Sequence, residues 1–208
     1  TANWALMING IPKFADIEYD RFGMDPKDLK SKISKNTSAI IPIHYAGLPC
    51  KIEEIVKYAR MKKIPVIEDA AESLGSSINK QKVGTFGDAG IFSFAGNKVL
   101  TSGEGGAVVT NSKKIFERLQ LIRSHGRIKN QNYFQTNEKP NYIELGYNWR
   151  MSSLTAALAE SQLKKIDKLI KMRRDNAKFL IKQLKKHKVI EFMNEEKGTK
   201  HVFQLFTI

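Results

Sequence analysis

The segment GDAGIFSFAGNKVLTSGEGGAVVTN, residues 87–111, joins an apolar strand to a lysine and a glycine-rich turn. The apolar run carries one hydroxyl, Ser93, and ends just before Lys98, while the glycines of residues 103–106 allow a backbone to approach a ligand closely. A lysine amine forms a Schiff base readily only where a partly dry pocket or a nearby cation keeps some of it neutral. We expect Lys98 to be such an amine, against the alternative that it is a solvated surface lysine in a basic chain.

A second run, IPVIEDAAES at residues 64–73, ends a short apolar strand on Asp69. Upstream, AIIPI at residues 39–43 predicts another buried strand, and apolar residues at helical spacing between 52 and 59 predict the helix that connects the two. In such a βαβ unit the strands are parallel, so His44 and Asp69 should both emerge at the carboxyl edge of the sheet, beside the ligand crevice. Two structural alternatives stay open, because Asp69 could cap the following turn and His44 could be a buried, satisfied histidine.

The rest of the chain continues the alternation of strands and helices. We expect short helices through Trp4 and from Asp25-Pro26, strands at 90–94 and 107–110, and a covering helix at 113–123. A polar loop should follow over residues 130–142, and a long helix from about Ser152 to Lys186 should lead into a smaller lobe. The predicted fold class is α/β and doubly wound, with a mostly parallel sheet flanked by helices.

The composition limits the class of protein. Hydrophobic residues make up 41% of the 208, which is ordinary for a globular chain with one large domain. The single cysteine cannot form an internal disulfide, and no stretch approaches the roughly 18 apolar residues of a membrane span, so we expect a cytoplasmic protein without a membrane partner. The net charge of +14 is concentrated in residues 162–200, on an expected helix face, and no nucleic-acid-binding signature accompanies it. We therefore expect no nucleic-acid partner.

The strings around both decisive residues occur together in one known family. EDAAE at 68–72 and GDAGIFSFAGNK at 87–98 match a DAA(E/Q) strand end and a GD-x-G-x-FSF-x-x-x-K segment. The agreement continues through GEGG at 103–106, SHG at 124–126, ELGYNWRM at 144–151 and HVF at 201–203. The chain therefore resembles the DegT/DnrJ/EryC1/StrS family of pyridoxal-phosphate-dependent sugar aminotransferases, and within it the perosamine synthase type. Lys98 argues against the dehydratase branch, in which histidine replaces the lysine.

The resemblance also implies a domain organisation. Residues 1–150 would belong to the cofactor-binding large domain of the PLP-dependent transferase fold type I, without its N-terminal part. Residues 151–208 would form the long connecting helix and the start of a smaller C-terminal α/β domain. Family members carry a phosphate cradle and a stacking aromatic residue upstream of the position of Thr1. We therefore expect an internal fragment that by itself binds the cofactor weakly and is inactive.

The family's cofactor residues carry over to matching positions. By resemblance, Lys98 would hold pyridoxal 5'-phosphate covalently, and Asp69 would keep the pyridine nitrogen protonated, which makes the ring an electron sink. Glu72 would lie near the phenolic oxygen of the cofactor or near the substrate, or else contact the turn at Asp69. Ser93 would donate a hydrogen bond to the cofactor phosphate, or else bond to backbone as a core serine.

Two of the remaining matches imply a second subunit and a substrate. Asn148 resembles the asparagine that reaches the phosphate of the neighbouring subunit's cofactor, which would give a homodimer with shared active sites; the alternative is a turn residue. Arg150 and His44 are the expected substrate-binding residues. We expect no metal site.

The function implied by the resemblance is transfer of an amino group from glutamate to a nucleotide-linked 4-keto-6-deoxysugar. The product would serve amino-sugar and surface polysaccharide biosynthesis, such as that of O-antigen or lipopolysaccharide. Lys98, once displaced from the cofactor, would move the proton, because it already stands within hydrogen-bonding reach. Two alternatives stay open: a non-catalytic sensor of the same fold that binds the cofactor or a nucleotide sugar, and a sugar aminotransferase specific for carbon 3.

Overall fold

The computed structural model describes residues 1–127 and 141–208 of the chain. Its helical elements are α1 (Asn3–Met7), α2 (Pro26–Lys32), the short 3-10 turn η1 (Tyr45–Gly47), α3 (Ile52–Met61), α4 (Lys113–Ile122), α5 (Ser153–Leu163) and α6 (Ile166–Leu184). Its strands are β1 (Ile67–Asp69), β2 (Ser77–Ile78), β3 (Gln81–Lys82), β4 (Ala89–Ser93), β5 (Gly106–Val109) and β6 (Thr199–Lys200). Most of the loop expected at residues 130–142 lies outside the described residues.

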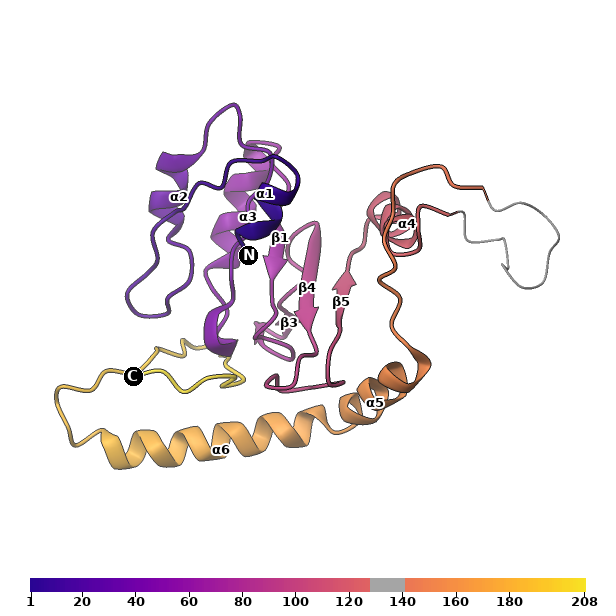
Figure 1. Cartoon of the computed structure of the whole chain (residues 1–208). Helices are drawn as coiled ribbons and strands as arrows, with labels where there is room; N and C mark the ends of the chain where they lie inside the picture. The colour runs from indigo at the N-terminus through magenta and orange to yellow at the C-terminus, as the bar shows by residue number, and fades with distance from the viewer. Residues whose placement is uncertain (128–140) are drawn as a thin grey trace.

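A short sheet in the order β1-β4-β5 occupies the centre of the fold (Figure 1). β1 and β4 run parallel, with Asp69 opposite Ile91, and the predicted strand at 39–43 adds parallel bridges from Ile40 and Ile43 to the other side of β1. This strand forms isolated bridges only, because the amide that would donate to the carbonyl of Ile67 belongs to Pro42, which has no N–H. The parallel βαβ prediction is confirmed.

The direction of β5 differs from the expected pattern. β5 runs antiparallel to β4, with Phe92 opposite Ala107. Residues 94–105 form turns instead of a crossover helix, and a parallel pairing needs such a crossover. The sheet is thus mostly parallel, with one antiparallel edge.

The largest hydrophobic core lies between α3 and the sheet. The predicted apolar face of α3 is buried, with Ile52, Ile55, Val56 and Ala59 at positions that share one side of a helix. Val66, just before β1, and Phe86 belong to the same cluster. α4, in contrast, has no buried residue, so the prediction that it covers the strands is wrong for the described chain; it lies beyond β5 in Figure 1.

The long helix predicted from Ser152 to Lys186 is divided. α5 ends at Leu163 and α6 begins at Ile166, with a turn at Lys164 and Lys165 between them. The turn lets α6 run below the carboxyl ends of β1 and β4 (Figure 1), where its Ile170 is buried with Val99 and Val202. None of the helices in the described ranges is both long enough and apolar enough to span a membrane.

The end of the chain returns to the main body of the fold. β6 pairs antiparallel with β2, so that Lys200 lies opposite Ser77, and β2 also pairs with β3. Residues 199–205 therefore pack against elements of the first hundred residues. The domain division at residue 150 stays a prediction.

Candidate active site

Lys98 lies in the turn that follows β4, and its amine is only partly exposed. The Nζ atom lies 3.5 Å from Oε1 of Glu72, and the Lys98 side chain is 15% exposed. The second carboxylate oxygen of Glu72 accepts the N–H of Ala46, in η1, at 2.9 Å. Because this amine is held by a carboxylate that is itself anchored to backbone, Lys98 is not the solvated surface lysine of the alternative interpretation.

Asp69 ends β1 at the carboxyl edge of the sheet. Its backbone is fixed on both sides, because its N–H donates to Pro42 and its carbonyl accepts from His44. Oδ1 accepts the N–H of Ala71 at 3.2 Å, which is the turn-capping contact of the alternative, while Oδ2 accepts the hydroxyl of Thr1 at 2.5 Å. One carboxylate oxygen thus stabilises the turn, and the other faces the N-terminal segment.

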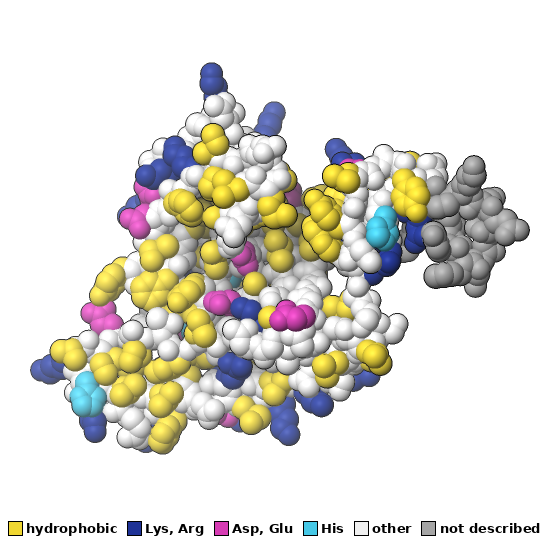
Figure 2. Space-filling view, in the orientation of Figure 1, with side chains coloured by type: hydrophobic (Ala, Val, Ile, Leu, Met, Phe, Trp, Pro, Cys, Tyr) yellow, Lys and Arg dark blue, Asp and Glu magenta, His cyan; other side chains and the backbone are white. Residues whose placement is uncertain are grey.

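The turn after β1 brings the two predicted catalytic residues to one edge. Glu72 follows Asp69 by three positions and contacts Lys98, which itself follows the parallel neighbour strand β4. Figure 2 shows acidic side chains beside a basic one in the hollowed middle of the visible face, above the layer formed by α5 and α6. The structure therefore groups Asp69, Glu72 and Lys98 at the carboxyl ends of adjacent parallel strands, where folds of this class bind ligands.

Ser93, at the end of β4, is half-buried in the same region. Its hydroxyl oxygen accepts the N–H of Ala95 at 3.3 Å. This is a weak, local contact of the kind expected for a core serine, and it leaves the hydroxyl proton available for a second partner.

Asn148 and Arg150 lie apart from this group, on the segment that packs beside α4. Asn148 is exposed and forms an antiparallel bridge with Ser124, and Arg150 donates from Nη1 to the hydroxyl of Ser124 at 3.1 Å. The structure does not bring either residue to Lys98 within one chain. Their exposure leaves both side chains available to a second molecule.

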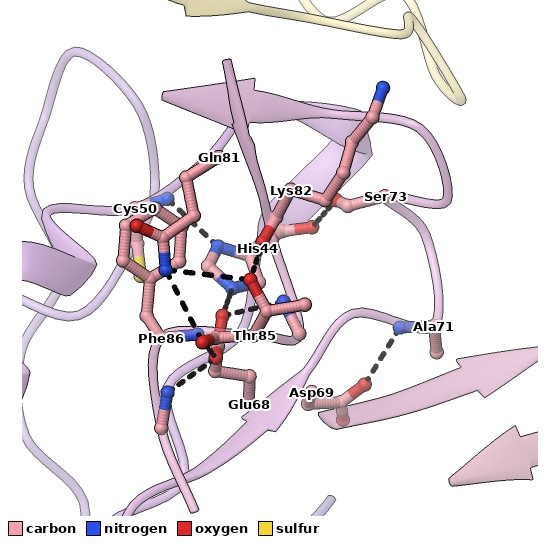
Figure 3. A network of polar contacts seen from close by, with 12 residues as sticks. His44, Cys50, Glu68, Asp69, Ala71, Ser73, Gln81, Lys82, Thr85 and Phe86 are labelled. Atoms are coloured by element: carbon pink, nitrogen blue, oxygen red, sulfur yellow. Dashed lines mark hydrogen bonds and ion pairs between the residues drawn. The ribbon is translucent and has the colours of Figure 1, made fainter. Parts of the chain in front are cut away.

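His44 is the one predicted site residue that the structure corrects. The side chain is fully buried, Nε2 lies 3.0 Å from Oε2 of Glu68, and Nδ1 accepts the backbone N–H of Cys50 at 3.2 Å (Figure 3). Since Nδ1 accepts a hydrogen bond, it carries no proton of its own, and the ring proton lies on Nε2, which donates to Glu68. A ring with both nitrogens paired and no exposed surface cannot bind a substrate, so the buried-histidine alternative describes this residue.

Glu68, in β1, stabilises the sheet edge through hydrogen bonds from buried groups, and the sequence analysis did not identify it. Its fully buried carboxylate accepts four hydrogen bonds, from His44 and from the backbone amides of Gly84, Phe86 and Gly87. Burial alone would raise the pKa of this carboxyl, but the hydrogen bonds from His44 and the amides outweigh burial and leave the pKa below its ordinary value. An acid inside an apolar strand, paired with a histidine at the end of the neighbouring strand, is the sequence signal that could have found it.

The grouped side chains fit pyridoxal phosphate in their chemistry. The cofactor needs an amine for covalent attachment and an acid beside its pyridine nitrogen, and Lys98 and Asp69 supply this pair at one sheet edge. Glu72 adds a carboxylate next to the amine, and Ser93 adds a hydroxyl at the end of β4. These are the residues that would hold the cofactor.

Comparisons with known proteins agree with this geometry. The chain is 35% identical over 208 residues to the GDP-perosamine synthase of Vibrio cholerae, a match that covers 100% of this chain and 54% of the relative. It is also 35% identical over 211 residues to a UDP-4-amino-4,6-dideoxy-N-acetyl-beta-L-altrosamine transaminase of Campylobacter jejuni, covering 99% and 54%. Among solved structures, Helicobacter pylori PseC, an aminotransferase involved in the biosynthesis of pseudoaminic acid, superposes with a TM-score of 0.92 at 32% identity, covering 99% and 54%.

The matches cover nearly all of this chain but only part of each relative. The chain spans about half the length of the curated relatives it matches. The sequence profile of the DegT/DnrJ/EryC1/StrS aminotransferase family matches all of residues 1–208. With the grouped amine and acids and the close structural agreement, the chain belongs to the DegT/DnrJ/EryC1/StrS aminotransferase family, whose members depend on pyridoxal phosphate.

Proposed function

We propose that the protein containing this chain is an aminotransferase that moves an amino group from glutamate to a nucleotide-linked 4-keto-6-deoxysugar. The observation that carries the proposal is the approach of the Lys98 amine to Glu72, three residues after Asp69, at the carboxyl edge of parallel strands. The names of the relatives, among them a perosamine synthase and an altrosamine transaminase, support a nucleotide sugar as the acceptor. The product would serve surface polysaccharide biosynthesis in the cytoplasm.

Each grouped side chain has a task in this proposal. Bound pyridoxal phosphate supplies an electron sink for the carbon that loses a proton. The carboxylate of Asp69 would hold a proton at the pyridine nitrogen. The amine of Lys98 would attach the cofactor and, when free, would serve as the base that moves the proton, because a base must stand within hydrogen-bonding distance of that proton. Glu72 keeps the amine at this position.

The remaining residues are assigned to the phosphate, the partner subunit and the sugar. Ser93 would donate its free hydroxyl proton to the cofactor phosphate. Asn148 would reach the cofactor of a second subunit and Arg150 its substrate, which makes the protein a homodimer with shared sites. Both side chains are exposed on a segment that lies away from Lys98, as such a role requires. In this arrangement residues 1–150 belong to the cofactor domain, and residues 151–208 lead into the second domain.

Substitution of the two central residues in the full-length protein tests the proposal. Lys98→Ala should abolish the visible absorbance of lysine-linked cofactor and reduce transamination to background. Asp69→Asn should retain bound cofactor but lose at least ~10²-fold in kcat, because the ring nitrogen is no longer kept cationic. Lys82→Ala is the matched control, since Lys82 is an exposed lysine whose amine donates to the carbonyl of Gly75. Wild-type turnover in Lys98→Ala would refute the assignment.

Two measurements identify the substrate class and distinguish the proposed enzyme from a non-catalytic sensor and from an aminotransferase specific for carbon 3. Glutamate should convert the absorbance of the lysine-linked cofactor to that of the aminated cofactor; an unchanged spectrum would identify a non-catalytic sensor. A panel of GDP- and UDP-linked 3-keto and 4-keto sugars, with the product analysed by NMR, then identifies the aminated carbon. Amination at carbon 3 would overturn the 4-keto assignment while leaving the aminotransferase class intact.

A further inference from the structure

Gln204 lies in the C-terminal segment of residues 201–205, which packs against the turn that carries Lys98. The side chain is 5% exposed and reaches this turn across 105 positions of sequence. Its Oε1 atom accepts the N–H of Val99 at 2.8 Å, and its Nε2 atom donates to the carbonyl of Asn97 at 2.7 Å. One carboxamide therefore bonds to backbone on both sides of Lys98.

These two bonds restrain the backbone of Lys98 itself. The peptide before Lys98 is held at both polar atoms, because its carbonyl accepts from Gln204 and its N–H donates to the carbonyl of Ala95 at 3.1 Å. The peptide after Lys98 is held through the N–H of Val99. Because peptide units are planar, fixing the two units beside one residue fixes its φ and ψ, and with them the direction in which its side chain leaves the backbone.

Gln204 is in turn held firmly by its own backbone neighbours. Leu205 donates to the carbonyl of Ala46 and Val202 donates to the carbonyl of Gly47, both at 3.1 Å, while Arg173 of α6 donates to the carbonyl of Gln204 at 3.1 Å. The segment approaches η1 so closely that a Cβ at Gly47, where φ is +97°, would lie 2.9 Å from the backbone nitrogen of Gln204. These contacts hold in place the two hydrogen bonds that link Gln204 to Asn97 and Val99, which together are called the clamp.

The turn η1, which holds the backbone near Gln204, is also linked to the side-chain amine of Lys98. Ala46 accepts from Leu205 through its carbonyl and donates its N–H to Glu72, and Glu72 contacts the amine of Lys98. The backbone of Lys98 and its amine are thus both held by elements that meet at η1. We propose that Gln204 is a positioning residue for Lys98, which sets the direction of the reactive amine; this inference rests on the proposed function.

The chemistry of the clamp explains why a glutamine stands at this position. The two groups to be bonded are one donor, the N–H of Val99, and one acceptor, the carbonyl of Asn97, and a carboxamide is the planar group that complements both. An ionised glutamate offers only acceptors, and a leucine of similar volume offers neither. A protonated glutamate offers one of each, so protonation should restore what the charged side chain lacks.

Kinetics of Gln204 variants in the full-length holoenzyme test the inference. Gln204→Leu should lower kcat per bound cofactor about 10-fold or more with KM within about 2-fold, because misplacement of a reacting group slows chemistry without removing substrate contacts. Gln204→Glu should show a similar loss at pH 8, and its activity relative to wild type should recover as the pH falls toward 6, since burial raises the pKa of the introduced carboxyl. The activity of Gln204→Leu relative to wild type should not change with pH.

The matched controls are Gln81→Leu and Gln81→Glu. Gln81 is an exposed glutamine in β3 whose carboxamide also donates to a backbone carbonyl, that of Thr85. A general loss of stability changes the amount of folded, cofactor-loaded protein, whereas a loss of Lys98 positioning changes kcat per bound cofactor. The recovery of Gln204→Glu is therefore measured as kcat per bound cofactor at each pH. If Gln204→Leu does not fold, this recovery decides the question alone.

A second readout needs no activity. In the cofactor-free protein, Gln204→Leu should raise the hydrogen exchange rate of the Val99 amide at least 10-fold, while the Val202 amide, which donates to Gly47, keeps its rate. An inactive wild type with this exchange result would refute the proposed transamination but retain the clamp. If the wild type is active and Gln204→Leu keeps the wild-type kcat, the positioning role is overturned, whatever the exchange rates. An unchanged hydrogen exchange rate of the Val99 amide in Gln204→Leu would also overturn it.

Discussion

Replacement of Glu68 by glutamine tests whether the buried carboxylate holds the sheet edge together. Oε2 accepts from Nε2 of His44 at 3.0 Å and from the N–H of Gly84 at 2.7 Å, while Oε1 accepts from Phe86 and Gly87, each at 2.7 Å (Figure 3). A carboxamide has the same shape but only one oxygen. Whichever way it is oriented, its NH₂ group faces two N–H donors.

The cost follows from the groups left without acceptors. Two hydrogen bonds to a charged group are lost, and two buried donors remain unsatisfied, at roughly 1–3 kcal/mol for each such group. Two such groups give a loss of about 4 kcal/mol in the free energy of unfolding. For a full-length protein about twice as long as this chain, the melting temperature should fall by about 5 °C.

The assay is thermal and urea unfolding of the full-length protein, followed by circular dichroism. Glu53→Gln is the control, because Glu53 is exposed in the first turn of α3 and its substitution should change stability by less than about 0.5 kcal/mol. A Glu68→Gln protein that melts within about 2 °C of wild type would refute the reasoning. That result would mean that water or local movement satisfies the freed donors.

Two further predictions concern pH and a close backbone approach. Burial lowers the pKa of His201 to about 4, below the 6.5 of the unfolded chain, so its contribution to stability is present above pH 6.5 and is lost as the pH falls toward 4. The loss is at most about 3 kcal/mol. His201→Asn keeps an acceptor for the N–H of Phe203 and should flatten the dependence of the free energy of unfolding on pH between these values. An equally steep dependence would show that His201 is not the titrating group. Gly90→Ala places a Cβ 2.3 Å from the Cα of Gly84 and should cost more than ~2 kcal/mol, whereas Gly103→Ala meets no atom within 4 Å and should cost only ~1 kcal/mol of backbone strain at φ +83°. Equal melting temperatures for the two glycine variants would show that the backbone at Gly84 moves away.

The local periodicity of the sequence was enough to place several elements. The apolar face of α3 and the parallel strands on either side of it follow from spacing alone, because a helix face and a buried strand repeat at different periods. The position of Asp69 at a strand end followed from the same pattern. Lys98 was found through its apolar and glycine-rich neighbours, and the family resemblance gave both residues their expected roles.

Other features depend on contacts between distant segments. The turn at Lys164 and Lys165 divides a stretch that reads as one helix, because α6 must bury Ile170 against Val99 and Val202. The antiparallel direction of β5 is decided by how the turn after Lys98 folds back on β4. Hydrophobic periodicity reports only on residues close together in sequence, so it predicts neither of these features.

The sequence by itself determined which groups the site contains. They are an amine, an acid and a second carboxylate, and each follows a strand that the apolar pattern predicts. What only the tertiary structure decided is how these groups are held. His44 is enclosed by Glu68 and Cys50 instead of facing a ligand, and Gln204 reaches the backbone beside Lys98 from the other end of the chain. The physical reason is that a hydrogen bond has a partner and a direction in space, and partners 105 positions apart leave no periodic signal in the chain.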